Sequence, residues 1–352
     1  MDEVRKVIFK KPNVNGFGWG KLIRKGKETG EGIVVTVTKK LPRELLSEKD
    51  MIPRNIDGVA TDVIEVGEIT LLSENENSAF PVDRTQKYRP VPLGVSVGNI
   101  DITAGTSGFL VEKDDNPMMV SNNHVFACVN KCEIGSLIVQ PGTYDAGGEY
   151  PENRIGTLYD YVPIKTVSCP YSNAIVKVLN FLAKIIGSKF RFQYKPVDFS
   201  KDRIPKNTVD CALCLLDSWD IAIPKPLEID AKCYEGLASV NVGDEVIKTG
   251  RTTGVTKGII RATDYECRVA MNKDMTEFAY FVDQLLIEPL PPFEKFSAPG
   301  DSGSSVGAFI DDKLYLIGLL FAGSEKYTVV NKISNVFEAL HLDPNSLIKR
   351  SY

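Results

Sequence analysis

The segment SAPGDSGSSV at residues 297–306 sets one serine between two glycines, just before a strand-like run. Gly300 and Gly303 flank the pair Asp301-Ser302. Because glycine has no Cβ, backbone amides can converge in such a turn where another residue would clash. Converging amides stabilise the oxyanion of an acyl transfer, and a serine can be its nucleophile. The segment therefore predicts Ser302 as nucleophile and the amides of Gly300 and Ser302 as oxyanion hole. The alternative is an ordinary turn serine.

A serine nucleophile needs a neutral imidazole to accept its proton, and the chain contains only two histidines. His124 lies in VSNNHVFA (120–127), at the end of an apolar strand-like run. His341 lies in the amphipathic segment NKISNVFEALHL (331–342) and is expected at the surface. His124 is therefore the candidate general base, and the alternative is a core histidine that caps a strand. Two histidines also exclude a metal centre built from several of them.

A buried carboxylate must hold that imidazole in one tautomer and one orientation. Asp210 lies near the start of the apolar run VDCALCLLD (209–217), which has the composition of a buried strand. Asp160, Asp217 and Asp220 are competing candidates. We favour Asp210 because it heads an apolar strand.

From about residue 95 onward, short apolar runs alternate with glycine-containing turns. This texture is typical of an all-β barrel or sandwich, and the runs are numerous enough for two barrels. The runs are TSGFLVE (106–112), PMMVSNNHVF (117–126), GSLIVQPG (135–142), NRIGTLYDYVPI (153–164), VDCALCLLD (209–217), DEVIKTGRTTGVTKGIIRAT (244–263), FAYFVDQLLIE (278–288), DSGSSVGAFI (301–310) and LYLIGLLFAG (314–323). The segment at 172–187 has helical spacing instead, and we expect a helix that packs on the barrel or forms an oligomer contact.

The beginning of the chain has a pattern of its own. GFGWGKLIRK (16–25) and GIVVTVTKKL (32–41) are strand-like and flank the polar sequence KETGE, which predicts a hairpin. LPRELLSEKDMIPRNIDG (41–58) is interpreted as a short helix or a proline-punctuated loop. VATDVIEVGEITLL (59–72) alternates apolar and polar residues, as one half-buried strand should.

These patterns predict a chain in three parts. A small α/β domain occupies 1–75, and a polar, proline-bearing linker follows at 76–94. The third part, at 95–352, holds a first barrel at about 95–217 with the helical insertion and a second barrel at about 218–340. An amphipathic C-terminal helix closes the chain.

Three motifs occur in the order histidine, aspartate, serine: NNHV (122–125), VDCAL (209–213) and GDSGS (300–304). Each resembles a motif of the chymotrypsin-like (trypsin-fold) serine proteases. KTGRTTGVTKGII (248–260) is similar to a hairpin of the alpha-lytic-protease and streptogrisin relatives. GLLFAGS (318–324) lies where that family places the strand that pairs with substrate backbone. The resemblance covers about 70% of the chain.

The resemblance implies a mainly β fold, a double six-stranded antiparallel β-barrel (chymotrypsin-like) with a small N-terminal α/β domain. It implies a serine endopeptidase that cleaves polypeptides through an acyl-enzyme, with His124, Asp210 and Ser302 as catalytic triad. With its N-terminal unit, the architecture further resembles leaderless bacterial trypsin-like proteins and the plant narrow-leaf proteins. The rival hypothesis is a protease-fold scaffold or regulatory binding protein whose triad is latent or inaccessible.

The resemblance also implies which residues bind substrate. The base of the first specificity pocket falls about six residues before the serine, at Phe296. Phe321, Ala322 and Gly323 would form the strand beside the substrate backbone. Phe296 and Phe321 place no charged side chain at the base of the specificity pocket. An apolar or small side chain is therefore expected at the cleaved position rather than lysine or arginine.

The unit at 1–75 contains no nucleophile–base pair, so we expect it to set assembly or access rather than chemistry. A homo-oligomer formed through this unit or through the helical insertion is one such role. The alternative is a prosegment removed by a cut at Arg84, Lys87 or Arg89. Asp301 could pair with a freshly cut terminus only after a cut near residue 90, so activation in the manner of trypsinogen is not expected.

Charge and composition exclude several classes of function. With 42 basic and 46 acidic residues the formal net charge is −4, so neither nucleic acid nor a membrane is an expected partner. The start of the chain is unlike a secretory signal, and no apolar run is long enough to span a bilayer.

Seven cysteines in such a chain predict free thiols and a cytoplasmic location. Cys211 and Cys214 are expected to be buried hydrophobes, and no metal or cofactor is predicted.

Overall fold

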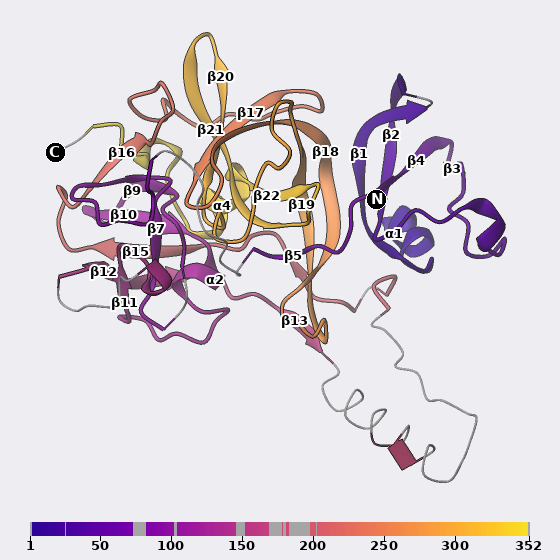
Figure 1. Cartoon of the computed structure of the whole chain (residues 1–352), viewed down its shortest axis with the longest axis horizontal. Coiled ribbons are helices and arrows are strands. Elements are labelled where there is room, and N and C mark those ends of the chain that lie inside the picture. The colour runs from indigo at the N-terminus through magenta and orange to yellow at the C-terminus, as the bar shows by residue number, and fades with distance from the viewer. Residues whose placement is uncertain are drawn as a thin grey trace.

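The structure is a computed structural model that describes residues 2–24, 26–72, 82–101, 104–145, 152–168, 178, 181–182, 198–201 and 203–350. Its centre is a barrel whose six strands close on themselves in the order β17-β18-β19-β22-β21-β20, with β20 paired back to β17 (Figure 1). These strands are β17 (Glu245–Gly250), β18 (Gly254–Ala270), β19 (Glu277–Pro289), β20 (Ser305–Ile310), β21 (Lys313–Gly323) and β22 (Thr328–Lys332). This is the second of the two expected barrels.

Beside it lies a sheet of seven strands in the order β8-β7-β11-β12-β15-β10-β9. Its strands are β7 (Ser96–Asn99), β8 (Gly105–Thr106), β9 (Phe109–Lys113), β10 (Asn116–Ser121), β11 (Leu137–Val139), β12 (Arg154–Tyr161) and β15 (Ala212–Leu216). The outer strands β8 and β9 are joined by the chain itself through Ser107 and Gly108, which brings the two edges of the sheet together. The closed barrel and the half-barrel match the expected chymotrypsin-like double-barrel fold.

Shorter elements complete the two barrels. The strands β13 (Thr166–Ser168) and β14 (Lys206–Asn207) pair with β19, and β6 (Val91–Leu93) pairs with β16 (Ala222–Pro226). The helix α4 (Ile333–Ala339) lies within the C-terminal segment predicted to be amphipathic. Its Phe337 ring stacks on Phe109 of β9 at 5.7 Å, so the end of the chain covers the first sheet, and His341 is exposed as expected.

The N-terminal unit consists of α1 (Asp2–Ile8), β1 (Val14–Arg24), β2 (Lys27–Val37), a short 3₁₀ turn (Arg43–Leu45), β3 (Asn55–Ile56) and β4 (Val59–Glu65). The hairpin of β1 and β2 is confirmed, but the sequence KETGE lies inside β2 rather than in the turn. Gly26, at φ 73°, supplies the left-handed conformation that this tight turn requires. The helix α1 was not predicted from the sequence.

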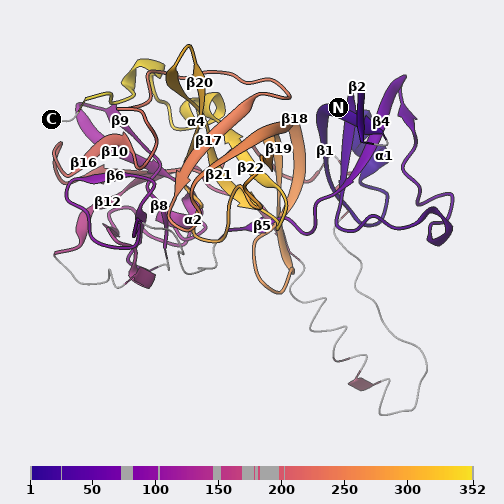
Figure 2. The same cartoon turned by 45° about the horizontal axis from the view of Figure 1, so that its top comes forward.

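The hairpin joins the second barrel directly. The strand β1 runs antiparallel to β18, with Gly16 opposite Cys267 and Gly20 opposite Ala262 (Figure 2). A buried hydrogen bond of 2.7 Å between Thr36 and Tyr265 adds to this contact. The first residues of the chain therefore extend the sheet that carries much of the candidate site.

The expected single strand at 59–72 is wrong, because the chain breaks into β4 and the short strand β5 (Thr70–Leu71). Gly67, at φ 79°, turns the chain between them. The strand β5 then pairs antiparallel with the end of β21 and meets β18 in parallel. This turn carries the end of the N-terminal unit into the second barrel (Figure 1).

The predicted helix at 172–187 lies almost entirely outside the described residues. Val178, Phe181 and Leu182 are described, are helical and have exposed side chains. Within the described part of the chain, no helix is long and apolar enough to cross a membrane.

Candidate active site

His124 lies in α2 (Asn123–Phe126), a single helical turn that follows β10. Its Nδ1 is 2.6 Å from Asp210 Oδ2, and its backbone amide donates to Asp210 Oδ1 at 3.2 Å. Asp210 is completely buried, and its main chain is held by the side chains of Asn122 and Asn331. A buried carboxylate fixed in this way holds one orientation of the imidazole.

The competing carboxylates lie elsewhere. Asp160 is exposed and accepts from the amide of Tyr161, and Asp217 pairs with Arg154. Asp220 accepts from the Ser218 hydroxyl on the surface. Asp210 is thus the carboxylate, of those considered from sequence, that contacts His124.

Ser302 is buried in the turn between the glycines Gly300 and Gly303, whose φ angles are 97° and 92°. Only glycine adopts this conformation at little cost, as the sequence pattern requires. The Ser302 hydroxyl donates to two main-chain carbonyls, those of Leu72 and Phe321, each at 3.2 Å. A hydrogen bond from Ser302 to His124, which proton transfer between them would use, is not formed.

The loops that carry His124 and Ser302 nevertheless both pack against β8. A Cβ on Gly105 would lie 2.5 Å from a Val125 methyl and 3.0 Å from the Ser302 carbonyl oxygen. The amide of Thr106 donates to that same carbonyl at 2.8 Å. Among the described residues, His124 Nε2 is buried without a hydrogen-bond partner. Glycine in β8 therefore allows the two loops to pack closely.

The amide of Gly300 donates to the Leu72 carbonyl oxygen at 2.9 Å. This is the same oxygen that the Ser302 hydroxyl reaches. A predicted oxyanion-hole donor and the predicted nucleophile therefore converge on one carbonyl of the chain itself. Nothing in the sequence around Leu72 predicted that its carbonyl would lie at the candidate site.

Sequence reasoning also missed Lys248, whose ammonium lies 3.4 Å from the Asp301 carboxylate. Both side chains are fully buried, and Asp301 also accepts from the amides of Ala298, Thr252 and Thr253. Asp301 thus finds its positive partner inside the folded chain. A lysine in the apolar strand EVIKTG (β17) was the available signal, because a buried lysine needs a counter-charge.

The turn at Arg251-Thr252-Thr253, which joins β17 to β18, supports the serine loop. The Thr252 hydroxyl donates to the Pro299 carbonyl at 2.7 Å. Arg251 binds both carboxylate oxygens of Asp145, which comes from a 3₁₀ turn (Thr143–Asp145) of the first barrel. This turn therefore holds the loop and joins the two barrels at the site.

The titration of Lys248 predicts an alkaline limit to activity. Burial lowers the pKa of its ammonium from the ordinary 10.5 to about 8, although the Asp301 carboxylate opposes the shift. As pH rises through about 8, Lys248 loses its charge and Asp301 loses its partner. We therefore expect kcat/KM to fall above about pH 8, measured as a pH profile of peptide hydrolysis.

A thermal scan at each pH separates this effect from unfolding. Between about pH 8 and 10.5, Lys248 binds a proton more fully in the unfolded chain than in the folded one. The contribution of Lys248 to the unfolding free energy therefore rises with pH in this range. The fall in activity should therefore occur without a fall in Tm caused by Lys248. A kcat/KM that stays constant from pH 7.5 to 10 would contradict the prediction.

The predicted substrate-binding residues divide between two apolar clusters. Phe296 is buried in one that also contains Leu72. The ring of Phe321 packs against Phe281, at 4.6 Å, in the other cluster, and only the Phe321 carbonyl faces the serine. Ala322 and Gly323, which complete the predicted substrate-pairing strand, pair with β5.

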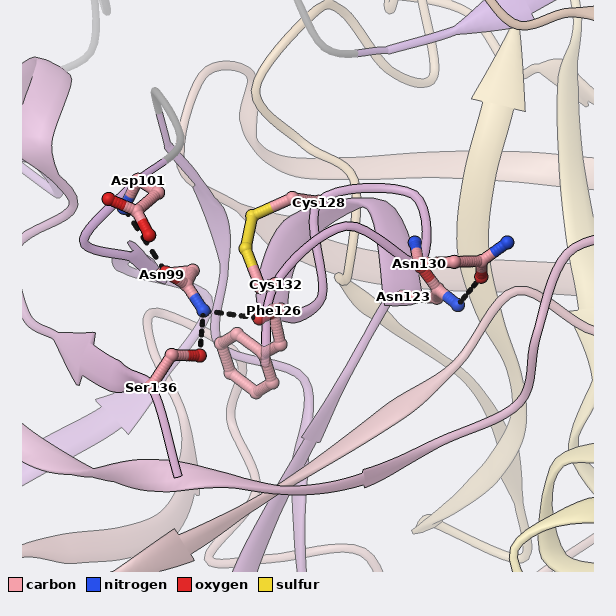
Figure 3. Close-up of a disulfide and its surroundings, with 8 residues drawn as sticks. All are labelled: Asn99, Asp101, Asn123, Phe126, Cys128, Asn130, Cys132 and Ser136. Carbon is pink, nitrogen blue, oxygen red and sulfur yellow. Dashed lines mark hydrogen bonds between the residues drawn. A yellow bond between two sulfur atoms is a disulfide. The ribbon is translucent and has the colours of Figure 1, made fainter. Parts of the chain in front are cut away.

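The expectation that all cysteines are free thiols is wrong for Cys128 and Cys132, which form a disulfide just after α2 (Figure 3). Residues 128–130 all have positive φ angles and reverse the chain, which brings Cys132 back to Cys128. Asn130 and Asn123 exchange hydrogen bonds across this loop. A sequence spacing of four cannot reveal such a reversal.

The other described cysteines remain free and buried: Cys211, Cys214, Cys233 and Cys267. Burial raises the pKa of the Cys211 and Cys214 thiols well above the usual value, as for inert core residues. Within the described ranges, no three His, Cys, Asp or Glu side chains group together as metal ligands do.

No model of a known protein family matches the sequence, and no curated protein matches it significantly. Among solved structures, the chain is similar to Thermobifida fusca protease A, with 13% identity over 71% of this chain and 96% of that one and a TM-score of 0.43. It is similar to a Nocardiopsis protease with 13% identity, 71% and 96% coverage and a TM-score of 0.41. It also resembles Cellulomonas bogoriensis chymotrypsin, with 14% identity, 74% and 99% coverage and a TM-score of 0.41. Identity this low assigns no activity.

Proposed function

We propose that this protein is a serine endopeptidase that works through an acyl-enzyme. The observation that carries the proposal is a convergence on one atom, because the Gly300 amide and the Ser302 hydroxyl both donate to the Leu72 carbonyl oxygen. Peptide-bond hydrolysis requires a main-chain carbonyl within reach of a nucleophile and an oxyanion donor. The buried pair of His124 and Asp210 supplies the acid–base chemistry in this proposal.

In the proposed reaction, Ser302 Oγ attacks the carbonyl carbon of the substrate and His124 takes its proton at Nε2. The absence of another partner for Nε2 among the described residues leaves it available as acceptor. Asp210 accepts from Nδ1 and stabilises the imidazolium as it forms. His124 then protonates the leaving amine, and water hydrolyses the acyl-enzyme by the same route.

The amides of Gly300 and Ser302 hold the oxyanion in this proposal. Their loop is anchored by the ion pair of Asp301 and Lys248 and by the Thr252 turn, so the donors are in place before substrate binds. Preorganised donors need no rearrangement as charge develops. The proposed reaction uses water as its only co-reactant.

The proposed substrate is an extended polypeptide. The end of β21 offers main-chain groups at Ala322 and Gly323 that pair with an antiparallel strand. The apolar cluster around Phe296 favours an apolar side chain at the cleaved position. Together with the N-terminal unit, these features support the finer proposal of a bacterial trypsin-like or plant narrow-leaf type.

The test is covalent labelling with a fluorophosphonate probe. We expect the wild type to be labelled and Ser302→Ala to remain unlabelled, because only an activated serine reacts with the probe. Ser218→Ala, at an exposed serine, is the matched control and should label as the wild type does. Labelling that persists in Ser302→Ala would contradict the assignment. A folded protein without any labelling would favour the rival scaffold or binding protein.

A further inference from the structure

The strand β5 lies where the proposed function places the backbone of a substrate. It runs antiparallel to the end of β21, with Leu71 opposite Ala322 and Thr70 opposite Gly323. A peptide substrate of the proposed enzyme would add to β21 in this way. The chain therefore presents its own segment to its own candidate active site.

Leu72, the next residue, occupies the position of the residue whose carbonyl is attacked. Its carbonyl oxygen is 2.9 Å from the Gly300 amide and 3.2 Å from Ser302 Oγ. In a bound substrate, the carbonyl that meets both an oxyanion donor and the nucleophile belongs to the bond that is cut. That bond here is the one that follows Leu72 in the sequence.

The side chain of Leu72 occupies an apolar pocket. It is only 4% exposed and belongs to the cluster that contains Phe296, Val306 and Leu320. A Leu72 methyl lies 3.5 Å from the position that a Cβ on Gly323 would take. The pocket thus accommodates a leucine at the cleaved position, in agreement with the apolar preference expected from sequence.

We propose that the chain is its own first substrate and cuts itself after Leu72. This inference rests on the proposed endopeptidase function and names a substrate for it. The segment is tethered to the site by the fold, so the reaction is intramolecular and is favoured by the pre-set geometry. The cleaved bond joins Leu72 to Ser73.

The chemistry balances as a hydrolysis. A bond forms between Ser302 Oγ and the Leu72 carbonyl carbon while the hydroxyl proton moves to His124. The carbon–nitrogen bond to Ser73 then breaks, and His124 returns that proton to the Ser73 nitrogen. Water next attacks the Leu72 ester with His124 as base. The products are a Leu72 carboxylate, a Ser73 amine and regenerated Ser302.

The N-terminal fragment should stay bound after the cut. The pairing of β1 with β18 and the packing of Leu72 in its pocket do not depend on the cleaved bond. The resulting protein has two chains, and the segment at 70–72 fills the site as a bound product. A substrate added in solution must displace that segment.

Mass spectrometry of the purified full chain tests the proposal. We expect wild-type protein as two fragments, one ending at Leu72 and one beginning at Ser73, that co-elute in native gel filtration. Ser302→Ala should remain intact. Leu72→Asp should cut more than about 100-fold more slowly, because a carboxylate is costly in an apolar pocket. Leu45→Asp, at a residue that is 71% exposed, is the matched control and should cut at the wild-type rate.

Fluorophosphonate labelling separates this proposal from the proposed function. Leu72→Asp should label faster than wild type because its cleft is emptied, which also shows that the variant folds. An intact wild type that is labelled at Ser302 would overturn self-cleavage while the endopeptidase stands. An intact wild type with no labelling, together with an unlabelled Leu72→Asp, would overturn both. Added wild-type protein should not cut Ser302→Ala after Leu72 as fast as the wild type processes itself. Equal rates would overturn the intramolecular reaction.

Discussion

Asp210→Asn should lower kcat about 10⁴-fold and leave the fold intact. Asparagine has the shape of aspartate, and the main-chain contacts of residue 210 with Asn122 and Asn331 do not depend on the carboxylate. Its amide cannot stabilise the His124 imidazolium and favours the wrong tautomer of the ring. Such a loss corresponds to about 5.5 kcal/mol of transition-state stabilisation. Hydrolysis of a chromogenic peptide with leucine at the cleaved position measures it.

The other carboxylates are the controls for this change. Asp160→Asn, Asp217→Asn and Asp220→Asn should each change kcat/KM far less, because these side chains lie at the surface away from His124. The role of Asp210 would be refuted if Asp210→Asn kept more than about a tenth of the wild-type kcat/KM while one of the three controls lost orders of magnitude.

Lys248→Met should lower the unfolding free energy by about 1–3 kcal/mol, because it removes the buried hydrogen bonds of the ammonium to Thr253 and Gly254 together with the counter-charge of Asp301. The activity should fall as well, since Asp301 adjoins Gly300 and Ser302 in the oxyanion loop. Chemical denaturation with the midpoint followed by fluorescence measures the first effect, and peptide hydrolysis measures the second.

Two further variants show whether the charge itself matters. Lys257→Met removes an exposed lysine of β18 and should leave the denaturation midpoint unchanged. Lys248→Met combined with Asp301→Asn should recover part of the lost stability, because no uncompensated charge then remains buried. A single Lys248→Met variant as stable as wild type would show that the pair does not anchor the loop.

Local pattern was sufficient for the fold class and for the choice of candidate site residues. Ser302 was identified because glycines on both sides permit a turn of positive φ, and the structure has those angles. Asp210 was favoured because it heads an apolar strand, and burial beside β15 is what such a strand imposes. The alternation of short apolar runs and turns indicated the barrels, because the side chains of a strand alternate between its two faces.

Contacts between distant parts of the chain were beyond this reasoning. Leu72 and Ser302 are 230 residues apart, and only the pairing of β5 with β21 brings them together. Lys248 and Asp301 are 53 residues apart, and their ion pair depends on how β17 meets the serine loop. Even the disulfide of Cys128 and Cys132 depends on three successive left-handed residues rather than on its spacing.

The division follows from the range of the forces involved. Periodicity and glycine turns depend on neighbours along the chain, so the amino-acid sequence alone determined the fold class and the candidate nucleophile, base and carboxylate of this protein. The partner of Asp301 and the segment that pairs with the end of β21 depend on strand register and on buried charge, which exist only once the sheets have assembled. The tertiary structure alone therefore decided that Lys248 neutralises Asp301 and that the chain's own Leu72 lies beside Ser302.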